Sequence, residues 1–440
     1  MIHKSILLPL AVFITALFLT AISSAQSEET IANEPVTEST ALPLKELRLF
    51  TLIFDHIRRS YVEPISDQQL LENAIKGMLG EMDPHSAYLD ASSFEQLQES
   101  TKGEFTGIGV EMSNEDGFIK VISPIDGSPA EKAGLQAGDI IIKVDQQSIQ
   151  GLSVSDAAKK IRGPIGSTVV FTIIRENVEQ PVEVTITRDI IKSISIRHRV
   201  IEDNIGYVRI AQFQSETGND FVTSIQKLRS DTPTLNGLII DLRNNPGGIL
   251  QSSVQVVDAL INSGTVAYTQ GRLDSSNISF SATEGDEADG LPVVVLINGG
   301  SASASEIVAG ALQDHRRAVI MGTRSFGKGS VQTILPVGDK KGIKLTTARY
   351  FTPNGRSIQA QGITPDIIVE PATITTIKTS ERLTEASLGG HLKNTSGDTS
   401  KKTGVETNTS SSAPIIKDNQ LFEAINLLKG LAILTQKPSL

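Results

Sequence analysis

The chain has 440 residues, enough for two to four domains, and 40 basic against 50 acidic residues give it a net charge of −10. No basic patch with interleaved aromatic residues occurs, so we expect no nucleic-acid partner. With no cysteine, disulfides, a thiol nucleophile and a lipid-modified amino-terminal cysteine are excluded. The six histidines lack paired spacing, so we expect no metal site and no cofactor.

The amino terminus has the pattern of an export signal. Lys4 precedes an apolar run over residues 6–22, and Ser23-Ser24-Ala25 offers the small residues of a cleavage site. We predict a cleavable signal peptide over residues 1–25, with an uncleaved membrane anchor formed by residues 6–22 as the alternative. Both place the rest of the chain outside the cytoplasm, and the signal fits a bacterial periplasm.

Residues 26–103 form a predicted N-terminal helical region. After a polar leader, apolar residues recur at helical spacing from Leu42 to about Ser100, and the stretch Gly80–Pro84 interrupts them. An apolar helical stretch usually serves packing and not chemistry. We therefore interpret this region, including His56 and His85, as structural.

Residues 104–190 contain a glycine-rich loop followed by short strands. The loop is Phe105-Thr-Gly-Ile-Gly-Val110, and Val154–Ile161 has a helical pattern. This segment resembles a PDZ domain. The resemblance implies that Gly107, Ile108, Gly109 and Val110 bind the terminal carboxylate of a peptide added to a sheet edge. Alternatively, the groove is occluded and the domain serves as a gate.

Residues 191–372 alternate between apolar strands and helices. Ile205–Ile210 and Gly237–Leu242 are predicted strands, and Leu250–Ile261 is a predicted helix. This alternation indicates a mainly parallel sheet covered by helices. Asp241–Gly248 ends a strand in a Pro-Gly-Gly turn, where glycines let backbone N–H groups approach a ligand. The whole chain is thus predicted to be an α+β multidomain protein.

The stretch Pro292–Gln332 carries the candidate chemistry. Val293–Ile297 is a predicted buried strand, and the serines 301, 303 and 305 follow it at the start of a helix. The free N–H groups at a helix start can stabilise negative charge. Lys328 lies between two glycines, so a Ser–Lys nucleophilic site is predicted. The alternative is that Ser303 and Glu306 only form a capping box.

The residues of this stretch also suggest three other kinds of site, and each has an argument against it. His315 is twelve residues along the same helix from Ser303, roughly 18 Å away, so a Ser–His pair is excluded if the helix is continuous. Gly322-x4-Gly-Lys328 matches most of a phosphate-binding loop, but Gly329 replaces the magnesium-binding Ser or Thr. Ser325-x-x-Lys328 matches penicillin-recognising enzymes, but glycines flank this lysine and no Ser-Asp-Asn occurs.

The motifs taken together resemble one protease family, the carboxyl-terminal processing peptidases. These are tail-specific, PDZ-containing serine proteases of peptidase family S41. Four segments carry the resemblance, and their order and spacing are specific: Ser301–Glu306, Ser325–Gln332, Asp241–Gly248 and Thr347–Asp366. In the family the nucleophile precedes the lysine by 25 positions, and 328 − 303 = 25 selects Ser303.

The resemblance implies a role for each site residue. Ser303 would be the nucleophile, Lys328 its general base and Gln332 the residue that orients the lysine. The N–H of Ala304 and that of Gly248, or alternatively Gly247, would form the oxyanion hole. A neutral lysine requires its pKa to fall from about 10.4 to near 7, which costs about 4 kcal/mol. Burial and a nearby helix N-terminus can supply this shift.

The resemblance also implies the fold and the partners. The core would be a crotonase/ClpP-like α/β serine protease with a β-rich cap. Its partners would be protein or peptide substrates with free carboxyl termini, further copies of the chain joined through the N- and C-terminal helices, and an activating adaptor. The expected function is a periplasmic serine endopeptidase that cleaves substrates near their carboxyl termini. The alternative is a PDZ scaffold whose protease core is inert without a partner.

The carboxyl-terminal part divides into two segments. Residues 373–414 are rich in Thr, Ser, Lys and Gly and are predicted to be a low-complexity linker. Residues 415–440 return to a helical apolar pattern. This last helix is too short to be stable alone, so it is expected to pack on its own chain or on a neighbour.

Overall fold

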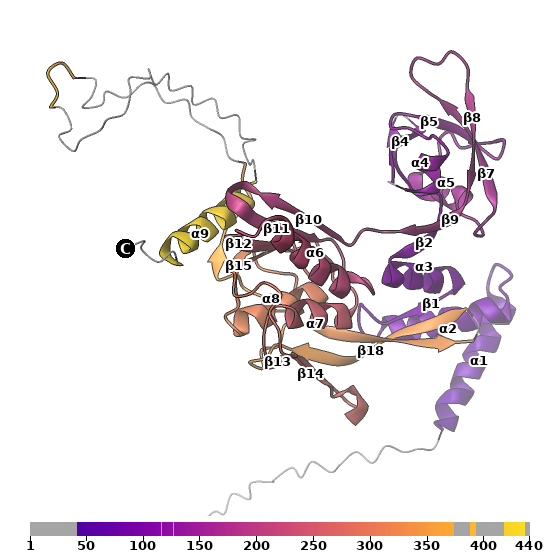
Figure 1. The fold of residues 1–440 in the computed structure, drawn as a ribbon. Helices are drawn as coiled ribbons and strands as arrows, with labels where there is room; N and C mark the ends of the chain where they lie inside the picture. Colours follow the sequence, from indigo (N-terminus) through magenta and orange to yellow (C-terminus); the bar gives the residue numbers. More distant parts are fainter. Residues whose placement is uncertain are drawn as a thin grey trace, which may run out of the picture. The chain divides into compact units, whose positions relative to one another are not determined.

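The computed structural model describes residues 42–435, apart from Asp116, Asp126, Asp339 and residues 374–387 and 393–417. The chain forms two compact units that meet in sequence between Leu71 and Glu72 (Figure 1). The predicted signal peptide over residues 1–25 lies outside the described residues, as does most of the predicted linker.

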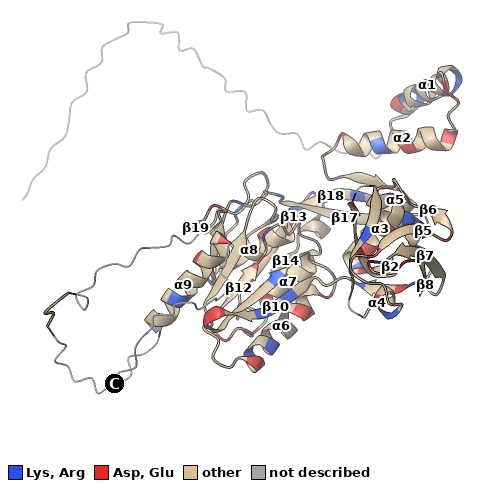
Figure 2. Cartoon of the chain, turned by 90° about the horizontal axis from the view of Figure 1, so that it is seen from above, with Lys and Arg blue, Asp and Glu red and all other residues tan. Residues whose placement is uncertain are grey.

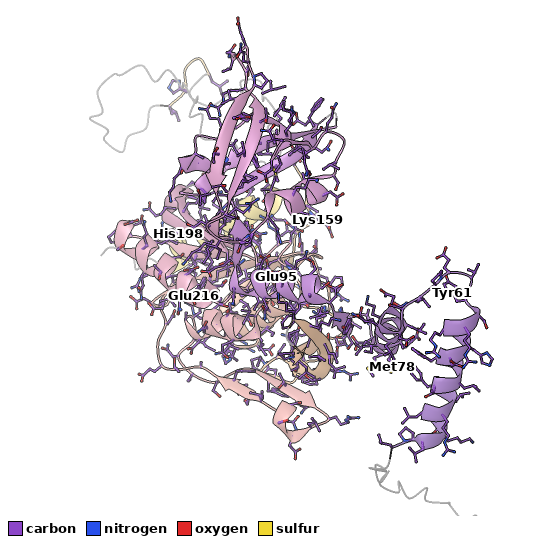
Figure 3. All side chains as sticks on the ribbon, turned by 90° about the vertical axis from the view of Figure 1, so that its right-hand side faces the viewer. Tyr61, Met78, Glu95, Lys159, His198 and Glu216 are labelled. Atoms are coloured by element: carbon purple, nitrogen blue, oxygen red, sulfur yellow. The ribbon has the colours of Figure 1, made fainter. Side chains whose placement is uncertain are left out.

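The first unit contains helix α1, Leu44–Ser60, and the first turn of helix α2, Asp67–Gly80. Helix α1 has no buried residue. Its side chains stand out around the helix, which ends just before Tyr61 (Figure 3). Seven of its apolar side chains are exposed: Leu44, Leu47, Leu49, Phe50, Leu52, Ile53 and Ile57.

A six-stranded sheet forms the centre of the second unit. Its strand order is β10-β11-β12-β15-β16-β19, in which only the β10–β11 pair is antiparallel. The strands are β10 Ile196–Ile201, β11 Ile205–Ile210, β12 Gly237–Asp241, β15 Val293–Ile297, β16 Ala318–Gly322 and β19 Ile367–Ile368. Every residue of β12 and β15 is buried, as the continuous apolar runs predict for strands covered on both faces.

Helices cover both faces of this sheet (Figure 1). Helices α6 Thr217–Asp231, α7 Leu250–Asp258 and α8 Ala304–Asp314 share one core with Val293, Val295 and Ile297. Helix α9, Asn419–Thr435, packs in another core with Val294 and Leu296. The alternation of side chains along β15 thus divides its residues between the two faces.

Helix α9 is anchored to the loop after β12. Arg243 Nη1 donates to Asp418 Oδ1 and to Gln420 Oε1, each at 3.0 Å. Gln420 Nε2 in turn donates to the Val369 carbonyl at 2.7 Å. Asp241 is a buried residue, only 3% exposed, and its Oδ2 accepts a hydrogen bond from Arg243 Nη2 at 2.7 Å. The carboxyl-terminal helix therefore packs on its own chain.

The segment that forms the parallel sheet also contributes most strands of an antiparallel sheet. Strand β18, Lys341–Phe351, pairs with β17 Ser330–Val337, β13 Thr265–Gly271 and β1 Ala87–Leu89. Strand β14, Ser279–Ser281, extends the sheet beyond β13, and short 3-10 turns occur at Glu202–Asn204 and Asp274–Ser276. Strand β1 and the following helix α3, Ala91–Lys102, come from the region predicted to be helical and only structural.

The PDZ segment has its own core of aliphatic side chains and Phe171. Its strands are β2 Glu104–Gly107, β3 Val110–Glu115, β4 Phe118–Pro124, β5 Ile140–Val144, β6 Gln147–Ser148, β7 Thr168–Ile174, β8 Val182–Thr187 and β9 Asp189–Lys192. Its helices are α4 Pro129–Lys132 and α5 Val154–Ile161. Figure 2 shows basic and acidic residues interspersed on the helices, as on α6.

Candidate active site

Ser303 lies where the chain leaves strand β15 and enters helix α8. It has φ +56° and ψ −115°, in the left-handed region that non-glycine residues rarely adopt. Two neighbouring serines hold this turn: Ser301 Oγ donates to the Leu242 carbonyl at 2.8 Å, and Ser305 Oγ donates to the Asn245 carbonyl at 3.0 Å. Of the three serines, Ser303 lines the adjacent cavity. Strain of this kind costs about 1–3 kcal/mol and clusters at functional sites.

The fully buried carboxylate of Glu306 links the Ser303 turn to the Lys328 loop. Its Oε2 accepts from the backbone N–H groups of Ser303 at 2.8 Å and Lys328 at 2.9 Å. Its Oε1 accepts from Ser325 Oγ at 2.6 Å and from the Gly327 N–H at 2.7 Å. Burial raises the pKa of Glu306, and these donors oppose the rise. Three of the four donors are N–H groups, which cannot accept, so they favour an ionised carboxylate.

The Lys328 amine lies in the same cavity as Ser303. Within the described part of the chain it makes no hydrogen bond and no ion pair. Burial lowers the pKa of Lys328, and the charge of Lys344 lowers it further, while Glu306 and Asp83 act in the opposite direction. The expected desolvation of this lysine is therefore present, and it favours the neutral amine that can accept a proton.

Two backbone N–H groups beside Ser303 are free. Those of Gly248 and Ala304 both border the cavity and donate to no atom among the residues described. The Gly247 N–H, in contrast, donates to Asn245 Oδ1 at 2.9 Å. Gly248 has φ +141°, and a Cβ there would lie 2.0 Å from the Phe213 carbonyl oxygen. Unpaired N–H groups at a buried site are rare and indicate a place for an acceptor on a ligand.

Gln332 lines the cavity, but its amide nitrogen is bonded to residues other than Lys328, the residue that it was expected to orient. Gln332 Nε2 donates to Ser330 Oγ at 2.8 Å and to Thr346 Oγ1 at 3.4 Å, and no bond joins it to Lys328. The register between β17 and β18 shifts between Val331 and Gln332. Such an irregularity redirects a side chain and is frequent beside active sites.

The cavity has a volume of about 350 Å³. Ser303, Lys328, Gln332, Gly248 and Ala304 all border it. Its other lining residues come from helices α3, α7 and α8, from strands β17 and β18, and from loops: Leu97, Ser100, Thr101, Gln212, Phe213, Pro246, Ile249, Leu250, Ile307, Ser330, Val331, Ile334, Lys344 and Tyr350. The chain thus offers a hydroxyl, an amine and two free N–H donors around one space, which suits acyl transfer.

Two comparisons with known proteins agree on the family. Residues 204–369 match "Peptidase family S41", residues 120–175 match "PDZ domain" and residues 11–93 match "Activating protease CtpB N-terminal domain". A carboxy-terminal-processing protease of Bartonella bacilliformis is 46% identical over 98% of this chain and 96% of that protein. The chain belongs to peptidase family S41. It is a serine-type peptidase with a PDZ domain, as the sequence motifs predict.

Other relatives carry related names. A carboxyl-terminal-processing protease of Synechocystis is 37% identical over 72% of this chain and 75% of that protein. Among solved structures, a photosystem II D1 C-terminal processing protease matches at 30% identity with a TM-score of 0.44, covering 73% of this chain and 86% of that one.

Sequence reasoning missed part of this S41 site, because helix α3 and the turn before β1 were treated as packing. Asp83 accepts from Ser86 Oγ at 2.6 Å and from the His85 and Ser86 N–H groups. It also accepts from Thr346 Oγ1, at 3.1 Å. Burial lowers the pKa of His85, and the charge of Lys328 lowers it further. The run Asp-Pro-His-Ser, read as a turn that presents a carboxylate, was the available signal.

The structure argues against the alternative assignments of the Lys328 loop and of His315. His315 caps the far end of α8 and its Nε2 lies 2.7 Å from the Thr265 carbonyl, so it is remote from Ser303. Ser325 is buried and bonded to Glu306, outside any helix. Strand β17 follows Gly329, where a phosphate-binding loop requires a helix.

The predicted carboxylate-binding loop of the PDZ domain lies between β2 and β3. The Ile108 and Gly109 N–H groups donate to no atom among the residues described, whereas their carbonyls accept from Ala130 and Ile125. Gly109 has φ +73°, and a Cβ there would lie 2.4 Å from Ser128 Cβ. This loop does not line the Ser303 cavity. It has the free donors that a peptide carboxylate requires.

Two features are absent from the described residues. No group of three or more His, Cys, Asp or Glu residues that could hold a metal ion occurs in residues 42–435 as described. No helix in that part of the chain is long and apolar enough to cross a membrane.

Proposed function

We propose that this S41 peptidase is an exported endopeptidase that cuts protein substrates near their carboxyl termini with a Ser303–Lys328 dyad. The observation that carries the proposal is the arrangement of the cavity. A strained serine, an unpartnered amine and two free N–H groups border one space of about 350 Å³. The names of the relatives support the substrate class, because several are carboxyl-terminal processing proteases.

The mechanism follows from these groups. Neutral Lys328 takes the Ser303 proton as Oγ forms a bond to the substrate carbonyl carbon. The resulting oxyanion accepts hydrogen bonds from the Gly248 and Ala304 N–H groups, each worth about 3 kcal/mol in the transition state. The lysinium then gives its proton to the leaving amine as the peptide bond breaks. A water molecule, deprotonated by Lys328, finally hydrolyses the acyl-enzyme.

Gln332 is proposed to position Lys328 during this cycle. In the described structure its amide nitrogen is bound to Ser330 and Thr346, which leaves its carbonyl oxygen as the group that could accept from a lysinium. The proposed role is thus confined to the charged form of the base. A Gln332→Glu variant tests this, because a carboxylate there would raise the pKa of Lys328 and move the acid limb of the rate profile upward.

The PDZ domain is proposed to capture the substrate terminus at Gly107–Val110, or to gate access to the protease. Helix α1 is proposed to join copies of the chain, since seven of its apolar residues are exposed in the described part of the chain. The match of residues 11–93 to an activating protease's N-terminal domain supports an adaptor as a further partner. Residues 1–25 are proposed as the export signal to the periplasm, and sequencing the mature amino terminus tests cleavage after Ala25.

The test of the proposed function uses purified wild-type, Ser303→Ala and Lys328→Ala proteins with casein as the unfolded substrate. We expect fragments from the wild type and none from either variant, with unchanged circular dichroism spectra. Undiminished cleavage by Lys328→Ala would eliminate the dyad. Binding of peptides without any cleavage by the wild type would favour the scaffold alternative.

A further inference from the structure

The catalytic cavity contains a second lysine that the proposed mechanism does not use. Strand β18 places Lys344 directly opposite Ile334 of β17, and Thr346 opposite Gln332. Because alternate residues of a strand point to the same face, Lys344, Thr346, Gln332 and Ile334 share one face of this sheet. Lys344, Gln332 and Ile334 all line the cavity beside Ser303.

The charge around Lys344 is uncompensated. Its amine makes no hydrogen bond and no ion pair within the described chain. The cavity lining contains two lysines and no acidic residue, although the chain as a whole has a net charge of −10. The nearby carboxylates of Glu306 and Asp83 are each occupied by four donated hydrogen bonds. A cationic surface of this kind favours an anionic ligand.

We propose that Lys344 forms a carboxylate-binding subsite, so that this peptidase prefers substrates with a carboxylate close to the cleaved bond. The inference rests on the proposed function. The ligand chemistry is one carboxylate, and it can come from the free end of the substrate chain or from an Asp or Glu side chain. An ammonium binds either one, because it is a point charge that donates up to three hydrogen bonds to carboxylate oxygens.

The test starts from a casein cleavage site found by mass spectrometry with the wild-type protein. Synthetic peptides spanning that site are made with a free carboxyl end close to the cut or with the amide, and with Asp and Glu or with Asn and Gln near the cut. We compare kcat/KM for the wild type, Lys344→Gln and Lys344→Arg. Lys340→Gln is the matched control, since this exposed lysine of the same hairpin does not line the cavity.

We expect the wild type to prefer one carboxylate form by roughly tenfold, the value of one charge-assisted hydrogen bond. Lys344→Gln should lose the preference, whereas Lys344→Arg and Lys340→Gln should keep it. A preference for the free carboxyl end over the amide identifies the chain end as the source of the carboxylate. A preference for Asp and Glu over Asn and Gln identifies a side chain as the source. Equal rates on all peptides, or a preference that survives in Lys344→Gln, overturn the inference. If the wild-type protein cleaved neither casein nor any of these peptides, the proposed function would be overturned instead.

The assay pH must take account of the protonation state of Lys328, the proposed base. Lys328 is faced by Lys344, Glu306 and Asp83, and it lies near His85. Removing the Lys344 charge removes repulsion, so the pKa of Lys328 rises in Lys344→Gln. Rates are therefore compared on the high-pH plateau of each variant, where Lys328 is neutral in both.

A separate observation concerns Tyr350, which also lines the cavity. Its side chain is 2% exposed, and its hydroxyl makes no hydrogen bond in the part of the chain that is described. Burial raises the pKa of Tyr350, Glu306 adds to the rise, and the Ser303 side chain acts against it. The hydroxyl is thus a protonated, unused donor near the nucleophile. A buried unpaired donor is costly, so it indicates a hydrogen bond that forms during catalysis.

We infer that Tyr350 is a positioning residue whose hydroxyl donates to Ser303 Oγ. One Oγ lone pair then accepts from Tyr350, the Oγ proton points to Lys328, and the remaining lone pair attacks the substrate. Tyr350→Phe separates this role from a structural one. Deleting an unpaired buried hydroxyl should leave the urea midpoint unchanged or raise it.

The expected result is a roughly tenfold lower kcat with little change in KM, since only the nucleophile loses a hydrogen bond. The rate at which a fluorophosphonate labels Ser303 should fall by the same factor, because that reagent needs no PDZ capture. Wild-type kcat and labelling in Tyr350→Phe would overturn the inference. A lowered urea midpoint together with lower activity would also overturn it, in favour of a structural role.

Discussion

Replacing Glu306 by Gln should damage both stability and catalysis, because one carboxylate binds the backbone of both Ser303, the proposed nucleophile, and Lys328, the proposed base. Oε1 accepts at 2.6 and 2.7 Å, and Oε2 accepts at 2.8 and 2.9 Å. Glutamine keeps one oxygen and presents an NH₂ group in place of the other. In one orientation the NH₂ faces the Gly327 N–H and Ser325, and in the other it faces the N–H groups of Ser303 and Lys328.

The magnitude follows from the better orientation. Ser325 Oγ can rotate to accept, so at least one N–H group, that of Gly327, remains unpaired. An unpaired buried donor costs about 1–3 kcal/mol, and the two bonds kept lose their charge assistance, for a total of about 2–4 kcal/mol. A displacement of about 1 Å between reacting groups lowers the rate by about 10²-fold.

The measurements are urea unfolding followed by circular dichroism and kcat/KM on a casein-derived peptide. Glu131→Gln is the matched control. Glu131 also follows a helix-capping serine by three residues and accepts a backbone N–H, from Gly127 at 2.7 Å, but on an exposed turn. We expect this control to resemble the wild type. If Glu306→Gln matched Glu131→Gln in both urea midpoint and kcat/KM, the clamp argument would be refuted.

Four further predictions follow from the same structure. Activity should rise with pH through the lowered pKa of Lys328 and be lost below it, and a flat rate profile from about pH 5 to 9 would contradict a lysine base. Gly248→Ala should lower kcat by about 10²-fold or more, because its Cβ would lie 2.0 Å from a carbonyl oxygen and displace the free N–H; kinetics check this. Ile425→Ala, at a fully buried α9 position, should lower the unfolding free energy by about 2–5 kcal/mol in urea titration. Hydrogen bonds hold the pKa of Asp83 below its usual range despite burial, so the stability that it contributes is present above pH about 4 and lost as pH falls further; Asp83→Asn should remove this acid dependence.

The sequence predicted the parallel sheet and the order of its elements because that information is local. The apolar runs of β12 and β15 could only be strands covered on both faces, and their burial agrees. Helix α8 and its capping glutamate were visible as Ser303-x-x-Glu306, although the carboxylate does more than cap. The family motifs alone place Ser303 and Lys328 in one proposed site.

The same local reasoning failed for residues 72–103. Leu97, Ser100 and Thr101 of α3 border the cavity that Ser303 lines, and β1 pairs with β18 more than two hundred residues later (Ala87 with Lys344). Periodicity reports which face of a helix is apolar but not which distant surface that face meets. For this reason the interpretation of His85 as merely structural omitted its position near Lys328.

The amino-acid sequence alone determined the domain types and the family and proposed Ser303 and Lys328 as the reactive pair, since each depends on residue type and spacing. Only the tertiary structure decided which donors are free, because a hydrogen bond is a property of two groups in space. Among the described residues, it showed that the Gly247 N–H has a hydrogen-bond partner and the Gly248 N–H has none, that Glu306 joins two loops, and that Lys344 and Tyr350 line the cavity without side-chain partners.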